Sequence, residues 1–242
     1  MEFYESTSTD PYYNLALEDY FFTHMDPMKD YFLLWQNDKA VIVGKYQNTL
    51  EEVDQTFVDE RGIRVARRLS GGGAVYHDLG NLNYTFIVEE DRAEAFRFEV
   101  FTKPLLAALK ELGVAAETSG RNDITIDGKK ISGSSQYFRN GRLLHHGCIL
   151  LDCDRDTLTR ALQVKEGKIR SKSIKSVRSR VTSINEHLER PITMARFKEV
   201  LRKQVFAAAP SRLEPGRFVG NPDFAGQPLR DVGVELRGVS PL

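Results

Sequence analysis

The chain has 242 residues, and its 34 Lys and Arg residues balance 34 Asp and Glu residues to a formal net charge of zero. That balance gives no support to a global electrostatic attraction to nucleic acid or to a membrane surface. The two cysteines, Cys148 and Cys153, are too few for a disulfide framework and lack zinc-ligand spacing. Because no apolar run is long enough to span a bilayer, we expect a cytoplasmic protein without nucleic-acid or membrane partners.

A first helix is predicted over residues 10–24. Asp10 is a suitable N-cap, and Pro11 suits the first helical position. Asn14 and Glu18 lie one turn apart in this helix, and we expect both on a solvated face.

Two apolar runs follow, at residues 31–36 and 40–44. The Asn-Asp-Lys tripeptide between them favours a turn, so the pair is predicted to form a β-hairpin. Trp35, the only tryptophan, is either a core residue or part of the wall of an apolar ligand pocket. A further helix is predicted over residues 50–60.

The most unusual stretch is residues 67–81, which read Arg-Arg-Leu-Ser-Gly-Gly-Gly-Ala-Val-Tyr-His-Asp-Leu-Gly-Asn. Three consecutive glycines weaken a helix or a strand, so they indicate a close approach of the backbone to another group. Two interpretations are open: a glycine-rich hairpin turn, or a loop that holds a carboxylate or phosphate against main-chain N–H groups. The flanking Arg, Ser, His and Asn residues favour the loop.

The second half of the chain alternates strand and helix patterns. Residues 93–112 are mostly helical, with Pro104 either kinking the helix or starting its second half. Asp-Gly at 127–128 and Asn-Gly at 140–141 predict tight turns between strands. The remaining predicted elements are strands at 81–88, 124–126, 129–136 and 143–151 and helices at 154–164 and 191–208.

Positive charge is concentrated in residues 165–180, where seven Lys and Arg residues accompany one acid. The segment lacks periodicity, so we expect a mobile loop, and its charge favours phosphate binding over a solvated linker. Residues 210–242 are rich in Pro and Gly and predict little regular structure. We therefore expect one domain over 1–209 and a C-terminal tail over 210–242.

Common nucleotide-binding and hydrolase motifs are missing. The sequence contains no P-loop pattern, and no helix follows the glycines as a dinucleotide-binding fingerprint requires. It also lacks a Gly-x-Ser-x-Gly nucleophile elbow between a strand and a helix. Polar clusters at 122–123, 130–132 and 145–148, like the glycine stretch, border predicted strands and can converge on one face of a sheet.

Several of these segments together resemble lipoate–protein ligases, members of the biotin/lipoate ligase and transferase superfamily. The matching segments occur in the family's order, at 67–81, 120–123, 130–134 and 145–147, and residues 176–182 resemble its adenylate-binding loop. The resemblance implies an α+β fold, with a mixed, mostly antiparallel sheet flanked by helices.

The resemblance also implies a reaction in two steps. ATP, with Mg²⁺, activates lipoate to lipoyl-AMP, and a lysine amine of a lipoyl-domain acceptor then attacks the activated carbonyl. The implied acceptors are acyltransferase subunits of 2-oxoacid dehydrogenases and the glycine cleavage H protein. Cations and backbone donors must bring a carboxylate and a triphosphate together despite their repulsion.

By similarity, Lys130 is the catalytic residue that holds the carboxylate oxygen and the α-phosphate. Asp123 is the candidate Mg²⁺ ligand. The basic loop at Arg178 and Arg180 would close over the adenylate and exclude water. The other residues implied in lipoate or adenylate binding are Trp35, Arg68, Ser70, Gly73, Val75, His77, Asn81, Asn122, Asp123, Ser132, His146, Gly147 and Cys148.

Two departures from the family leave alternatives open. Such ligases often carry a small C-terminal accessory domain, whereas residues 210–242 are a Pro/Gly-rich tail. We therefore expect either a separate accessory-domain partner or an enzyme that transfers from preformed lipoyl-AMP. Cys148 also directly follows a His-Gly pair, and related octanoyltransferases use a cysteine thioester. A small apolar filler is the favoured interpretation of this cysteine. A non-catalytic protein that binds lipoate or an adenylate is the third alternative.

Overall fold

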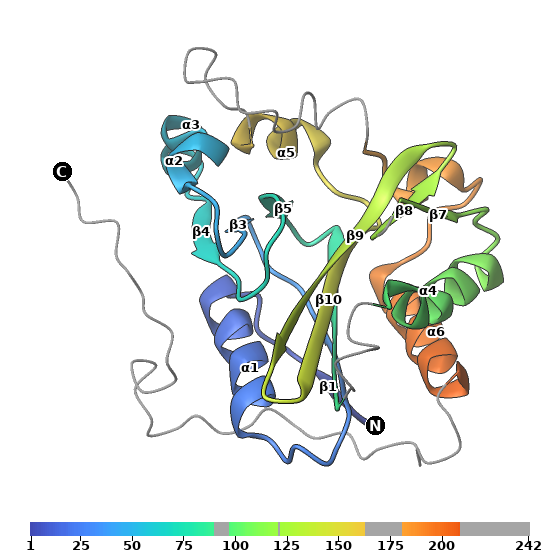
Figure 1. The fold of residues 1–242 in the computed structure, drawn as a ribbon. Coiled ribbons are helices and arrows are strands. Elements are labelled where there is room, and N and C mark those ends of the chain that lie inside the picture. Colours follow the sequence, from blue (N-terminus) through green and yellow to red (C-terminus); the bar gives the residue numbers. More distant parts are fainter. Residues whose placement is uncertain (90–96, 121, 163–180, 209–242) are drawn as a thin grey trace.

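The computed structural model describes residues 1–89, 97–120, 122–162 and 181–208, which form two β-sheets with helices around them (Figure 1). The larger sheet has seven strands in the order β1-β2-β6-β10-β9-β8-β7, and the smaller has the order β4-β3-β5. The strands are β1 (Glu2–Glu5), β2 (Tyr31–Trp35), β3 (Ala40–Val43), β4 (Arg64–Arg67), β5 (Val75–His77), β6 (Asn81–Glu89), β7 (Glu117–Ser119), β8 (Asp123–Ile126), β9 (Lys129–Arg139) and β10 (Arg142–Leu150). The helices are α1 (Pro11–His24), α2 (Thr49–Glu52), α3 (Gln55–Glu60), α4 (Phe98–Glu111), α5 (Arg155–Ala161), α6 (Met194–Ala208) and the 3₁₀ helix η1 (Ile184–His187).

The larger sheet is mixed but mostly antiparallel. In its described part, β1 and β2 run parallel, and the remaining neighbours run antiparallel. The predicted α+β class with a mostly antiparallel sheet is confirmed.

The two faces of the larger sheet are covered differently. On one face, alternate residues of β6, such as Tyr84 and Phe86, pack in a core with α4 and α6. The opposite face carries Asn83 and Thr85, which are also buried. Figure 1 shows α4 and α6 together on one side of the sheet, with α1 and the smaller sheet on the other.

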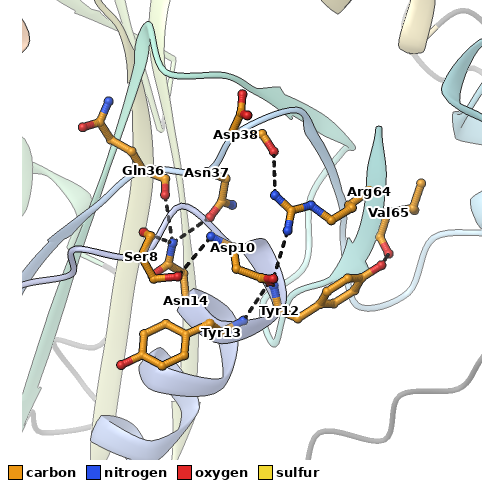
Figure 2. A network of polar contacts seen from close by, with 10 residues as sticks. All are labelled: Ser8, Asp10, Tyr12, Tyr13, Asn14, Gln36, Asn37, Asp38, Arg64 and Val65. Carbon is orange, nitrogen blue, oxygen red and sulfur yellow. Dashed lines mark hydrogen bonds and ion pairs between the residues drawn. The ribbon is translucent and has the colours of Figure 1, made fainter. Parts of the chain in front are cut away.

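Helix α1 begins where it was predicted to begin, but two of its polar residues face the interior of the protein and not the solvent. The Asp10 carboxylate accepts from the N–H groups of Tyr12 and Tyr13, and Pro11 begins the helix. The prediction of a solvated face for Asn14 and Glu18 is wrong, because each is only 1% exposed. Figure 2 shows Asn14 directed at the loop that follows β2. Both side chains are hydrogen-bonded, which is the condition for burying such groups.

The predicted hairpin over 31–36 and 40–44 is also wrong. Strand β2 pairs with β1 and β6, whereas β3 pairs with β4 and β5 in the smaller sheet. The connecting residues therefore carry the chain from one sheet to the other. Arg64 holds this connection, donating to the Asp38 carbonyl oxygen at 3.2 Å and to the Asp10 carboxylate at 2.9 Å (Figure 2).

The glycine stretch is not a hairpin turn. Strands β4 and β5, on either side of it, both pair with β3 and not with each other. The predicted helix over 50–60 is two short helices, since Asp54 caps α3 separately by accepting from the Phe57 N–H. Helix α4 continues through Pro104.

The two predicted tight turns are confirmed. Asp127 and Gly128 have φ values of 49° and 72°, and Asn140 and Gly141 have values of 53° and 75°. Positive φ at both central residues is the geometry of a two-residue hairpin loop. Among the described helices, none has the length and apolar composition needed to cross a membrane.

Candidate active site

A cavity of about 380 Å³ lies between the smaller sheet and the face of the larger sheet opposite α4 and α6. Its wall includes residues far apart in sequence, such as Ile42 of β3 and Ile131 of β9. Most of the predicted site residues line it: Trp35, Arg68, Gly73, Val75, His77, Asn122, Asp123, Lys130, Ser132, His146, Gly147 and Cys148. Ser70 and Asn81 are buried but are not among the lining residues, so they lie behind the wall. Arg178 and Arg180 are outside the described residues.

Lys130 and Asp123 form the charged end of the cavity. The Lys130 Nζ lies 2.8 Å from Asp123 Oδ1, and both side chains are partly exposed. The lysine stem passes over Gly133, where an added Cβ would lie only 2.5 Å from Nζ. Asn122 is fixed nearby, since its Nδ2 donates to the Ser134 carbonyl oxygen at 2.8 Å. The lack of a side chain at Gly133 therefore leaves room for the Lys130 ammonium group in the cavity.

Arg68 stabilises the glycine loop through hydrogen bonds to its backbone. Its Nη2 donates to the carbonyl oxygens of Gly71 at 2.7 Å and Gly73 at 2.8 Å. A Cβ on Gly44 would overlap the carbonyl oxygen of Gly72, so the loop requires glycine at 44 as well. Gly72 has a φ of 95°, a value that favours glycine. Burial lowers the Arg68 pKa, with the Cys148 and Glu18 side chains opposing that effect.

A chain of buried polar contacts connects the glycine loop to α1. Arg68 Nε donates to Ser70 Oγ at 3.2 Å, and Ser70 Oγ lies 2.5 Å from His146 Nε2. His146 Nδ1 is 2.8 Å from Glu18 Oε1, which also accepts from Thr85 Oγ1 at 2.7 Å. Because these contacts join four separate segments, the glycine loop, β10, α1 and β6, they fix the loop relative to the larger sheet.

The arrangement superficially resembles a Ser-His-acid triad. Ser70, however, is 1% exposed, is absent from the cavity wall and also accepts from Arg68. A nucleophile must reach the substrate, so this serine has a positioning role. Sequence reasoning identified Ser70 and His146 but missed Glu18.

Cys148 lies on the cavity wall in β10. Burial raises the pKa of its thiol, although Lys130 and Arg68 act in the opposite direction. A raised pKa keeps the sulfur in its weakly nucleophilic thiol form. The second cysteine, Cys153, contacts Ser183 at 3.7 Å and is absent from the lining.

Several lining residues were not predicted. Asn83 and Ser135 are polar members of the wall, and Leu15 and Ile42 are apolar ones. The sequence does contain a signal for Asn83, because apolar and polar residues alternate along 81–86 and Asn83 falls on the face opposite Leu82 and Tyr84. Leu15 and Ile42 resemble ordinary core residues in the sequence.

The comparisons with known proteins agree with this fold. Residues 10–206 match the family described as the lipoyl protein ligase A/B catalytic domain. This match covers most of the chain, which therefore belongs to that family.

The relatives give the comparison more detail. The chain is 50% identical over 197 residues to the lipoate-protein ligase LplJ of Bacillus subtilis strain 168, covering 81% of this chain and 60% of LplJ. It thus spans about 60% of the length of that relative. A bi-partite lipoate protein ligase from Thermoplasma acidophilum, studied with its E2 lipoyl domain, has a TM-score of 0.79 at 28% identity, covering 92% of this chain and 87% of that one. A lipoate-protein ligase A bound with ATP has a TM-score of 0.77 at 25% identity, with coverages of 92% and 90%.

Proposed function

We propose that the chain is the catalytic part of a lipoate–protein ligase. It activates lipoate with ATP to lipoyl-AMP and pyrophosphate, and transfers the lipoyl group to a lysine of a lipoyl-domain acceptor. The observation that carries this proposal is the position of Lys130, a cation at one end of a largely apolar cavity. Membership of the ligase family supports the same reaction.

Lys130 has the central role in activation. Its ammonium group would contact both the lipoate carboxylate and the α-phosphate and offset their mutual repulsion as the mixed anhydride forms. Asp123, at 2.8 Å, orients this group before ATP binds. The lipoate oxygen is the nucleophile in activation and the acceptor amine is the nucleophile in transfer, so no protein nucleophile is required.

The remaining lining residues hold the reactants in place. Arg68 fixes the glycine loop through the carbonyl groups of Gly71 and Gly73. Trp35 and Val75 offer apolar surface to the acyl chain. Enclosing a reactive adenylate in such a cavity protects it from hydrolysis.

Asp123 can serve as one ligand of Mg²⁺ but cannot hold the ion alone. The described residues contain no group of three or more His, Cys, Asp or Glu side chains that could hold a metal by themselves. Mg²⁺ is commonly bound by one or two carboxylates together with substrate phosphates, so a single carboxylate is compatible with it. The ion would supply positive charge to the phosphates, with Asp123 as its protein ligand.

The acceptors that we propose are lipoyl domains of 2-oxoacid dehydrogenase acyltransferase subunits and the glycine cleavage H protein, in the cytoplasm. The Thermoplasma relative is a bi-partite ligase. A separate accessory-domain protein is therefore the partner to test for the activation step.

The alternative octanoyltransferase mechanism is less well supported. It requires a Cys148 thiolate, whereas burial raises the pKa of this thiol. Replacing Cys148 with Ala should leave ATP-dependent lipoylation nearly intact. Loss of all transfer in the Cys148→Ala variant, with its fold retained, would favour the thioester route instead.

The direct test of the proposal follows pyrophosphate release from ATP and lipoate, with and without the accessory-domain partner. We expect lipoate-dependent release in at least one of the two conditions. Binding of lipoate without any turnover in either condition, or from preformed lipoyl-AMP, would instead indicate a non-catalytic binding protein.

A further inference from the structure

Strand β9 contains a β-bulge beside the proposed catalytic lysine. Ser132 pairs with Ile124 of β8, and Lys130 pairs with Thr125, the next residue along β8. Ile131 lies between them and therefore has no partner in β8. A β-bulge of this kind adds one residue to a strand and can redirect a neighbouring side chain.

The sheet register defines which face of β9 borders the cavity. Gly133 is paired with Asp123, and both residues line the cavity. Ser132 is paired with Ile124 and Ile149, which belong to the core that α4 and α6 cover. Side chains of paired residues share a face of the sheet, and successive residues alternate between faces. Gly133 is therefore on the cavity face, and Ser132 is on the core face.

Strict alternation would direct Lys130 away from the cavity. Counted back from Gly133, it would place Ile131 and Lys129 on the cavity face and Lys130 on the core face. The structure has the opposite arrangement. Lys130 Nζ lies 2.8 Å from Asp123 Oδ1 and 2.5 Å from the position of a Cβ on Gly133, whereas Ile131 is 0% exposed and belongs to the core. The extra residue at 131 thus reverses the alternation and turns Lys130 onto the cavity face.

A backbone contact on the other edge of β9 holds the bulge. Lys130 forms a parallel bridge with Val181, and the Thr182 N–H donates to the Lys130 carbonyl oxygen at 3.0 Å. Thr182 is 1% exposed, so this hydrogen bond is shielded from water. The segment that supplies it is itself anchored, since the Asn185 N–H donates to the Leu151 carbonyl oxygen at 3.0 Å.

We propose that the bulge at Ile131 is a positioning element that makes Lys130, and not its neighbour Lys129, the cation of the cavity. Ile131 anchors the bulge in the core, and the Thr182 N–H fixes the backbone of the lysine. This inference rests on the proposed function, because it concerns the lysine that offsets charge repulsion in activation. Misplacing such a group by about 1 Å can cost about 100-fold in rate, so loss of the bulge should lower kcat.

Substitutions at Ile131 separate positioning from packing. Ile131→Ala removes the anchor of the bulge, whereas Ile131→Val keeps a β-branched side chain in the core. Ile149→Ala is the matched control, because Ile149 is also 0% exposed in the same core and is absent from the cavity lining. We expect similar losses of stability in the two Ala variants, measured by urea unfolding. The kcat of pyrophosphate release should fall at least about tenfold in Ile131→Ala alone, with little change in the KM for lipoate and near-normal kcat in Ile131→Val.

The Thr182 N–H can be removed without changing a side chain. Replacing residue 182 with the α-hydroxy acid that carries the threonine side chain puts an ester oxygen in place of this N–H. The same change at residue 185 removes the backbone bond to Leu151, which has the same length. We expect similar losses of stability from the two esters, but a fall in kcat of at least about fivefold only for the ester at 182. This pair decides the question if Ile131→Ala does not fold.

Lysine modification gives a readout that does not depend on turnover. We would acetylate the protein with and without preformed lipoyl-AMP and quantify each lysine by mass spectrometry. We expect lipoyl-AMP to protect Lys130 and to leave Lys129 reactive. Protection of Lys129, or equal kcat values within each matched pair, would overturn the positioning role of the bulge. Protection of neither lysine would instead count against the proposed function.

Discussion

Lys130 is the residue on which the proposed chemistry depends most. Replacing it with Ala should lower the rate of pyrophosphate release by at least about 100-fold, a size typical for loss of a charge-stabilising group. The side chain is partly exposed, so the melting temperature should change little. Lys129→Ala is the matched control, because Lys129 is adjacent and exposed. Wild-type rates in Lys130→Ala would remove this lysine from the mechanism.

Glu18 tests the buried contacts that support the glycine loop. Glu18→Ala deprives His146 and Thr85 of their shared acceptor, so the free energy of unfolding should fall by about 3 kcal/mol. Lipoate activation should fall with it, because the loop loses its connection to α1. Glu18→Gln retains an acceptor oxygen and should be affected less. Urea unfolding measures the stability, with Glu60→Ala as the exposed-site control. Equal stability of the two variants would show that the buried contacts of Glu18 do not stabilise the loop.

At the scale of elements, glycines determine how closely segments approach. A Cβ at Gly133 would meet the flexible end of Lys130, so Gly133→Ala should retain the fold but displace the ammonium group. We expect at least a tenfold loss of activity with little change in melting temperature. Gly71→Ala is the control, since its Cβ would meet only Tyr46, at 3.9 Å. Full activity in Gly133→Ala would show that the position of Lys130 is not critical.

The elements also show which features could be predicted from sequence. Tight turns at 127–128 and 140–141 depend on local backbone preference, and both were predicted correctly. The partner of a strand depends on distant residues, so the connection between β2 and β3 was mistaken for a hairpin turn. Asn14 and Glu18 were placed on the wrong face, since the sequence does not show that each has a buried partner.

The same distinction applies to the site. Most of the predicted site residues line the cavity, and the family resemblance brought their motifs together. Asn83 was not predicted, because its place in the cavity wall depends on the pairing of β6 with the distant strands β2 and β10. Asn37 was interpreted only as part of a turn, since its contact with His77 joins the β2–β3 connection to β5, a strand distant in sequence.

At the scale of the whole molecule, two buried imidazoles make stability depend on pH. Burial, with smaller contributions from Arg68 and His146 at His77 and from His146 at His145, lowers the pKa values of His77 and His145 to about 3 from an ordinary value of 6.5. Between these values the unfolded chain binds more protons than the native one. The free energy of unfolding should therefore fall as the pH drops from about 6.5 towards 3.

A His145→Phe variant isolates one of these groups. The ring at 145 stacks on Phe101 at 4.4 Å, and a phenyl ring can keep that packing. The free energy of unfolding of this variant should change less steeply with pH. The slope should be smaller by up to about 1.4 kcal/mol per pH unit, which corresponds to the uptake of one proton. His24→Ala, at an exposed site, should leave the slope unchanged, and urea unfolding across this pH range measures both. An unaltered slope in His145→Phe would show that this ring is not buried in its neutral form.

The proposed reaction requires that this cavity hold lipoyl-adenylate and deliver its acyl group. The most direct measurement is the mass of an added lipoyl domain after incubation with preformed lipoyl-AMP, compared with ATP plus lipoate. We predict that lipoyl-AMP adds one lipoyl group to the acceptor lysine, and that ATP plus lipoate does so either alone or once the accessory partner is added. An acceptor whose mass is unchanged under all these conditions would rule out the proposed ligase reaction.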